Sequence, residues 1–213
     1  MINKSQDEQK TTGKKVIIAC SVMKPELEAI IEGDSSFELR YLDSTLHDTP
    51  KKMPELLQQE IDAVESYATQ IVLGYGFCSN GIAGVKAPRQ GIIVPRVHDC
   101  IALFLGSDQA YRDQFAKVPG TYYISAGWYT EQIEDDEAKQ DKIWVGSESM
   151  GCKEIREHYG DKSADNIIDF FSSWHHNYQR AAFIDTGIGN KKKYKQHAID
   201  LADKHGWKFE NIP

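Results

Sequence analysis

The chain has 213 residues, of which 40% are hydrophobic and 27% charged, and its formal net charge is −7. This composition is typical of one folded α/β domain and excludes a chain that is disordered throughout. The acidic balance argues against nucleic acid or an anionic lipid surface as a partner. No apolar run approaches the roughly 20 residues that span a bilayer, so we expect no membrane binding.

The first residues, 1–13, carry almost no large apolar side chains, and we expect them to form a disordered tail. They are followed by a single α/β domain over residues 14–213, and the strongly charged stretch 131–142 is where that domain would subdivide. The polar start lacks the apolar core of a secretory signal. We therefore expect a cytoplasmic protein whose cysteines are reduced.

Strands and helices alternate along the rest of the chain. Short apolar or alternating runs predict strands over residues 14–19, 37–42, 70–73, 91–94, 120–125, 181–184 and 207–209. Apolar residues at helical spacing predict helices over residues 25–32, 53–67, 100–105, 108–115, 132–141, 151–158, 166–178 and 191–205. This alternation predicts a mostly parallel, doubly wound, Rossmann-like sheet with helices on both faces.

Three of the four cysteines follow predicted strands. Cys20 ends the first strand, Cys78 lies in the glycine-rich loop after the third, and Cys100 follows the fourth, two residues after His98. Ligands of an open parallel sheet bind beyond the carboxyl ends of its strands, so we expect these side chains to converge. Three thiols and one imidazole suit a tetrahedral zinc ion or an iron–sulfur cluster. The sequence therefore predicts a metal site of Cys20, Cys78, His98 and Cys100, with buried structural cysteines as the alternative.

Four more residues of the same edge are predicted to contact a cofactor or a small-molecule ligand. His47 follows the second strand and is either a second-line ligand or proton carrier, or an exposed loop histidine. Arg96, in the loop that carries His98, is suited to hold an anionic group. Gly76 and Asn80 belong to the glycine-rich loop that carries Cys78.

Two further features have more than one interpretation. Cys152 stands at a predicted helix start and is a fourth ligand, a reactive thiol or a half-buried structural cysteine. The turn 185–191 opens a helix and carries glycines and lysines. It either binds an anion through its backbone amides or is a tight strand-to-helix turn with solvated lysines.

Several segments together carry a family resemblance. They are residues 19–20 with 23–27, 46–47 with 53 and 58, 74–81, 95–103, and 120–123 with 127–128. From about residue 14 to its end the chain resembles the bacterial and archaeal family called domain of unknown function 1638 (DUF1638). The loops that carry Cys78 and His98–Asp99–Cys100 are the specific part. Family members usually continue past the region of Trp207 with another acidic, apolar segment, whereas this chain stops at Pro213.

The resemblance implies a place in anaerobic one-carbon metabolism. Members of the family occur in anaerobes, often beside corrinoid-dependent methyltransferases and their activation proteins. The resemblance therefore implies a role in methyl transfer as a partner, a carrier or an accessory enzyme, with a corrinoid protein or a methyltransferase as the partner.

Three functions remain to be distinguished. The leading hypothesis is a protein that binds a metal, as zinc or an iron–sulfur cluster, through the cysteine loops. The second is a cofactor-independent enzyme of the racemase or isomerase kind, in which Cys20 and either Cys78 or Cys100 act as acid and base while residues 185–187 hold a substrate carboxylate. The third is a non-catalytic partner of a methyltransferase system, which docks through its acidic surface and the stretch 131–142.

Overall fold

The structure is a computed structural model that describes residues 13–48, 50–77, 80–133, 142–145 and 148–213. Except for Gly13, the predicted tail lies outside these residues. Within them, the strands form two three-stranded parallel sheets and one two-stranded hairpin. The predicted α/β, Rossmann-like class is therefore confirmed, with the parallel strands divided between two sheets.

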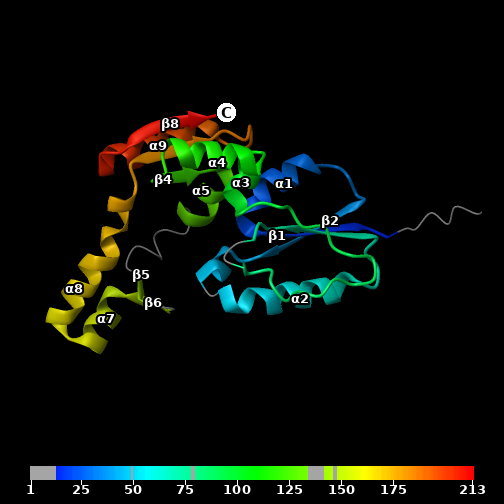
Figure 1. Ribbon diagram of the computed structural model, residues 1–213, viewed down its shortest axis with the longest axis horizontal. Helices are drawn as coiled ribbons and strands as arrows, with labels where there is room; N and C mark the ends of the chain where they lie inside the picture. The colour runs from blue at the N-terminus through cyan, green and yellow to red at the C-terminus, as the bar shows by residue number, and fades with distance from the viewer. Residues whose placement is uncertain (1–12, 49, 78–79, 134–141, 146–147) are drawn as a thin grey trace, which may run out of the picture.

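The first sheet has the order β2–β1–β3. Its strands are β1 (Lys15–Cys20), β2 (Phe37–Leu42) and β3 (Gln70–Gly74), connected by the helices α1 (Lys24–Ile30) and α2 (Met53–Val64). The connection from β2 to β3 runs back across β1, so right-handed crossovers place α1 and α2 on opposite faces of the sheet. Figure 1 shows this arrangement, with the sheet between the two helices.

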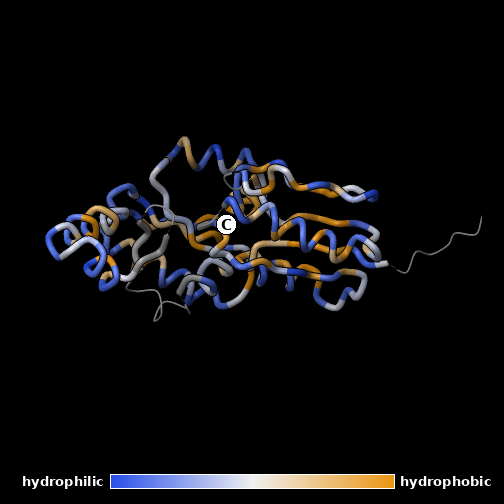
Figure 2. The backbone as a smooth tube through the Cα atoms, turned by 90° about the horizontal axis from the view of Figure 1, so that it is seen from below, coloured by the Kyte–Doolittle hydropathy of each residue, from blue (hydrophilic) through white to orange (hydrophobic). Residues whose placement is uncertain are grey.

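The core of the first half forms around β1. All residues of β1 after Lys15 are buried, which explains why this strand has an uninterrupted apolar run. The apolar stripe of α2, which includes Leu57, Ile61 and Val64, packs against this strand and β3. Figure 2 shows hydrophobic stretches of the backbone gathered toward the inside of the molecule, while many of the outer stretches are hydrophilic.

The second sheet has the order β4–β7–β8. Its strands are β4 (Thr121–Ile124), β7 (Arg180–Ile184) and β8 (Lys208–Ile212), all parallel. The helix α9 (Lys191–His205) connects β7 to β8 and packs on both through small residues. The helix α5 (Ala126–Ile133) follows β4 directly and lies between the two sheets (Figure 1).

The remaining elements surround these two sheets. A single-turn helix over Ser21–Met23 joins β1 to α1, and others cover Ser44–Asp48, Pro50–Lys52 and Ser173–Asn177. The other described elements are α3 (Cys100–Phe104), α4 (Asp108–Lys117), β5 (Lys142–Val145), β6 (Glu148–Gly151), α7 (Cys152–Tyr159) and α8 (Asp161–Ser172). The last four project from the body at the end farthest from the first sheet (Figure 1).

The strand predicted at residues 91–94 is reduced to a single parallel bridge between Ile93 and Val72. The segment does lie beside β3, because Ile93 accepts a backbone hydrogen bond from Leu73 at 2.8 Å and donates one to Ile71 at 2.9 Å. Gly91 has a left-handed φ of 76° and Pro95 has no backbone N–H. Gly91 and Pro95 limit the length of the extended segment between them, so only one bridge forms with β3.

The pattern also misses one element. The antiparallel hairpin β5–β6 comes directly after the charged stretch 131–142, where the sequence predicts a helix over 132–141. Most of that predicted helix, residues 134–141, lies outside the described residues. In the part of the chain that the structure describes, no helix combines the length and the apolarity needed to cross a membrane.

Candidate functional site

The segments that follow the three strands of the first sheet start at one edge of that sheet. The parallel register pairs Cys20, the last residue of β1, with Leu42 at the end of β2. It also pairs Ala19 with Gly74 at the end of β3. The chain after Cys20, the turn that holds His47 and the glycine-rich loop after Gly74 therefore begin side by side, as the strand-end rule predicts.

Cys20 and His47 are in contact at this edge. The Cys20 Sγ lies 3.6 Å from the His47 Nε2, and Cys20 is only 1% exposed. His47 belongs to the short helix Ser44–Asp48 after β2, and its neighbour Leu46 packs against the core of the first half. The packing of Leu46 thus helps to hold the imidazole against a buried thiol.

The two loops that carry the other predicted ligands lie against each other. The Phe77 amide donates a hydrogen bond to the Val97 carbonyl at 3.0 Å. A Cβ at Gly76 would lie 2.7 Å from the Cα of Asp99, so only glycine permits this approach. Gly76 thus allows its own loop to contact the backbone of the loop that carries Asp99. Cys78, two residues further on, lies outside the described residues.

His98 is turned toward solvent. Its side chain is 71% exposed, and its Nδ1 lies 2.9 Å from the Asp99 Oδ2. Its ring stacks on Tyr111 of α4 with 5.9 Å between ring centroids. The other Asp99 oxygen accepts hydrogen bonds from the amides of Ile101 and Ala102 and so caps the N-terminus of α3. The His98 ring thus contacts Asp99 and Tyr111, whereas the His47 ring contacts a cysteine.

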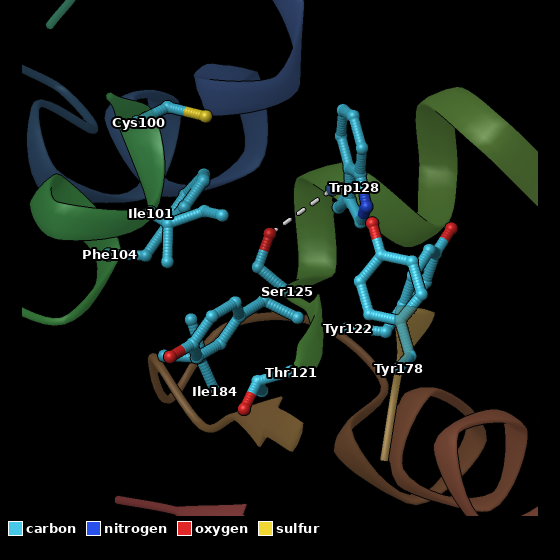
Figure 3. A pocket seen from close by; sticks show the side chains of 10 residues that line it. Cys100, Ile101, Phe104, Thr121, Tyr122, Ser125, Trp128, Tyr178 and Ile184 are labelled. Atoms are coloured by element: carbon cyan, nitrogen blue, oxygen red, sulfur yellow. Dashed lines mark hydrogen bonds between the residues drawn. The ribbon is translucent and has the colours of Figure 1, made fainter. Parts of the chain in front are cut away.

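Cys100 is the first residue of α3 and is half-buried. It packs against the same hydrophobic cluster that contains Cys20. It also borders a cavity of about 140 Å³ between α3, β4 and α5. Figure 3 shows its sulfur directed toward the side of the cavity where Trp128 stands.

The other predicted residues lie away from the Cys20–His47 contact or on the surface. Arg96 and Asn80 are exposed, and Asn80 adopts the left-handed conformation at φ 65°. Cys152 begins α7, which lies at the end of the molecule farthest from β1 (Figure 1). The structure therefore does not bring Cys152 to the edge that holds Cys20.

The turn 185–191 uses its own polar groups. The Asp185 carboxylate accepts a hydrogen bond from the Gly187 amide at 3.0 Å and forms an ion pair with Lys191, also at 3.0 Å. The hydrogen bond from Lys191 lowers the pKa of Asp185. The Asn190 side chain caps α9 through the Lys193 amide. The Gly187 amide and Lys191 are groups that could bind an anion, but they already contact the Asp185 carboxylate. These contacts favour the tight-turn interpretation.

Two carboxylates at the junction of the two halves, those of Glu131 and Glu26, were not predicted from the sequence. The Glu131 Oε2 of α5 accepts hydrogen bonds from the hydroxyls of Ser21, at 2.8 Å, and Ser44, at 3.2 Å. These serines flank β1 and β2 at the edge that carries Cys20 and His47, so α5 reaches across that edge. The sequence offered no signal, because Glu131 opens a charged stretch typical of a solvated surface.

Glu26 of α1 is buried, with 6% exposure. Its Oε1 accepts a hydrogen bond from the Thr186 hydroxyl at 3.0 Å, which joins α1 to the loop after β7. Its Oε2 has no hydrogen-bond partner among the residues that the structure describes. Burial raises the pKa of Glu26 above its ordinary value. An acidic residue in the first turn of a helix is usually a solvated partner of the helix dipole, so its burial was not foreseen.

The fold and this edge define a class of protein: an α/β protein with Rossmann-like parallel sheets and a thiol–imidazole pair beyond the carboxyl end of β1. The chain belongs to the family described as protein of unknown function (DUF1638), which matches residues 41–213. This confirms the resemblance noted in the sequence. No curated protein and no solved structure matches the chain at a significant level.

Proposed function

We propose that the protein binds a metal ion of the zinc type at the carboxyl edge of its first sheet. Cys20 and His47 supply two of the ligands, and Cys78 of the adjoining loop supplies a third. The observation that carries the proposal is the 3.6 Å distance between the Cys20 Sγ and the His47 Nε2. The proposal keeps Cys20 and Cys78 of the ligands expected from the sequence and replaces His98 with His47. It leaves out Cys100, because among the described residues Cys100 forms no metal-binding group with Cys20 and His47.

The measured distance fits the donor geometry of such a site. With zinc–sulfur and zinc–nitrogen distances of about 2.3 and 2.05 Å, a tetrahedral angle places the two ligand atoms about 3.6 Å apart. Thiolate and imidazole are also the donors that zinc prefers. Within the described residues, no three His, Cys, Asp or Glu side chains form a group that could hold a metal. Cys78, which lies outside them, is therefore an essential part of the proposal.

A metal ion at this edge would act as a Lewis acid on any ligand that reached an open coordination position. The protein's own contribution is to keep the Cys20 thiol dry and to orient the His47 ring. Glu131 adds a negative charge beside the serines that flank these residues. That charge favours a cation at the edge.

The experiment compares two histidines. The wild type, His47→Ala and His98→Ala are purified without oxygen, loaded with cobalt(II) and titrated by visible spectroscopy. We expect His47→Ala to lose more affinity than the roughly 10–100-fold that removal of an outer-shell partner costs. The matched control, His98→Ala, should bind like the wild type, because His98 is exposed and its ring contacts Asp99 and Tyr111. Cys78→Ser should also lose the metal.

Two results would contradict this assignment. One is unchanged cobalt binding in both His47→Ala and Cys78→Ser. The other is loss of binding in His98→Ala but not in His47→Ala. Far-UV circular dichroism of each variant verifies that the fold is intact, so that a lost metal is not confused with a lost structure.

The same contact favours a second candidate, a cofactor-independent acid–base enzyme. A thiol beside an imidazole is the arrangement that generates a reactive thiolate. In that case, metal-free protein would show a thiolate with a lowered pKa by ultraviolet absorbance, and His47→Ala would return it to the ordinary range near 8.5. The expected corrinoid or methyltransferase partner rests on the family resemblance alone and stays a prediction.

A further inference from the structure

A cavity lies between α3, β4 and α5, and residues other than the proposed metal ligands line it. Its volume is about 140 Å³. An apolar cavity of about 150 Å³ holds one molecule the size of benzene. The buried residues of its lining are Thr121, Ser125 and Ile184, and its other lining residues are half-buried. A small molecule can therefore reach it from the surface.

The walls are mostly aromatic and aliphatic. Figure 3 shows Trp128, Tyr122 and Tyr178 on one side of the cavity, and Ile101 and Phe104 on the other. No charged side chain belongs to the described lining. Such walls stabilise an apolar body by burial, at about 25 cal/mol for each Å² of apolar surface removed from water.

Thr121 and Ser125 bring two aliphatic hydroxyl groups to the lining of the cavity, and the two differ in their hydrogen-bond partners. The Thr121 hydroxyl donates to the Val118 carbonyl at 2.6 Å and accepts from the Arg180 Nε at 2.9 Å, so it is occupied. The Ser125 hydroxyl is 98% buried and accepts a hydrogen bond from the Trp128 amide at 3.2 Å (Figure 3). Among the residues that the structure describes, no acceptor for the Ser125 hydroxyl proton is found. That proton is thus available to a ligand.

The charged side chains near the cavity already form ion pairs with one another. Arg180 lies behind Thr121 and is 2% exposed, and its guanidinium forms an ion pair with Glu210 at 2.5 Å. Glu210 also pairs with Lys117 at 2.6 Å. An ionic ligand would thus find no partner charge in the lining. Burying an unpaired charge is strongly unfavourable.

We infer that this cavity is a binding site for an uncharged organic molecule of about the size of benzene that carries one hydrogen-bond acceptor. The apolar body of the ligand lies between the aromatic wall and Ile101, and its acceptor receives the Ser125 hydroxyl proton. This inference goes beyond the proposed metal site and uses different residues. Cys100 borders the cavity and is not one of the proposed metal ligands.

The probes are benzyl alcohol, toluene, benzoate and benzylammonium, which share one ring and differ in charge and in their acceptor. Binding to the full chain is measured by ligand-observed NMR titration. Benzyl alcohol should bind at least about tenfold more tightly than either ion, since an unpaired buried charge is costly. Ser125→Ala should weaken benzyl alcohol about fivefold, the value of one neutral hydrogen bond, and should leave toluene unchanged.

A cavity-filling variant locates the site. Ile101→Trp should abolish binding of benzyl alcohol, whereas Phe170→Ala, at a residue of α8 that is 72% exposed, should not change it. Equal binding of neutral and charged probes would overturn the inference. So would an equal response of toluene and benzyl alcohol to Ser125→Ala, or no binding of any probe to folded wild type. Repeating the titration in His47→Ala separates the two proposals, because the cavity does not need the metal.

Discussion

Glu26 gives a prediction at the scale of a single residue. Burial raises its pKa above the ordinary value of 4.5. As the pH rises past that value, the unfolded chain loses this proton before the folded chain does, so the free energy of unfolding falls. The loss continues until the pH exceeds the raised pKa of the folded protein, and stability then levels off. Glu26→Gln has no ionisable group and escapes this loss.

We therefore expect the stability of Glu26→Gln relative to wild type to increase as the pH rises above 4.5, as measured by urea unfolding. Thr186 can still donate to the amide oxygen of the variant, so the link between the halves remains. Glu28→Gln, at an exposed position of the same helix, is the matched control. Parallel stability–pH profiles for wild type and Glu26→Gln would contradict the prediction.

The two histidines show what sequence reasoning settles at this scale and what it does not. The position of His47 after a strand correctly indicated the carboxyl edge of the first sheet. His98 and Cys100, two residues apart after the fourth predicted strand, were predicted to belong to one metal site, but residues two apart share a side only on an extended segment. In the structure Cys100 begins a helix, and His98 is held outward by Asp99 and Tyr111. Such tertiary contacts leave no periodic signal in the sequence.

At the scale of elements, α5 is the helix that joins the two halves. A Cβ at Gly127 would lie 1.6 Å from the Val22 carbonyl oxygen, so this glycine lets α5 approach the chain that follows β1. One turn further on, Glu131 binds Ser21 and Ser44. Trp128, the residue after Gly127, packs against the core of the first half. Close backbone approach is therefore a condition of the fold.

Gly127→Ala should destabilise the protein. In an ordinary helix interior the same change stabilises by about 1 kcal/mol. Here the added methyl group must displace α5 or the Val22 backbone, and such overpacking costs about 1–3 kcal/mol. Urea unfolding of wild type and variant measures the sign of the change. An unchanged or higher free energy of unfolding in Gly127→Ala would refute the close contact.

The elements that the sequence predicted best are those with a strong internal pattern. β1, α2 and α9 appear close to their expected ends, because a continuous apolar run or a helical stripe is a local property. The hairpin β5–β6 was not predicted, and the predicted strand 91–94 is reduced to a single bridge, since pairing depends on neighbours far along the chain. Charged residues before the hairpin further hid its pattern.

At the scale of the whole molecule, the alternation of elements predicted parallel strands but not their division into two sheets. Strand order depends on which strands pair along their edges, and the pattern of a single sequence does not predict that pairing. The contacts of Glu26 with Thr186 and of α5 with the Val22 region tie the two sheets together. A single domain over residues 14–213 stays a prediction.

This tie predicts one cooperative unfolding transition. Thermal unfolding followed by far-UV circular dichroism reports the helices, and tryptophan fluorescence reports residues that include Trp128 at the junction. We expect the two curves to coincide, as they do for a single cooperative unit. Two separate transitions, or curves with different midpoints, would show that the halves unfold independently and would contradict the prediction.

The central claim is that the edge beside Cys20 holds a metal, and the most direct test is the metal content of the wild-type protein. The protein is purified without oxygen, and its bound metals and visible spectrum are measured together. The account predicts about one zinc ion per chain and no colour, as a mixed thiolate–imidazole site implies. A brown chromophore would assign the cysteines to an iron–sulfur cluster instead. Folded protein that binds neither zinc nor iron would contradict the account.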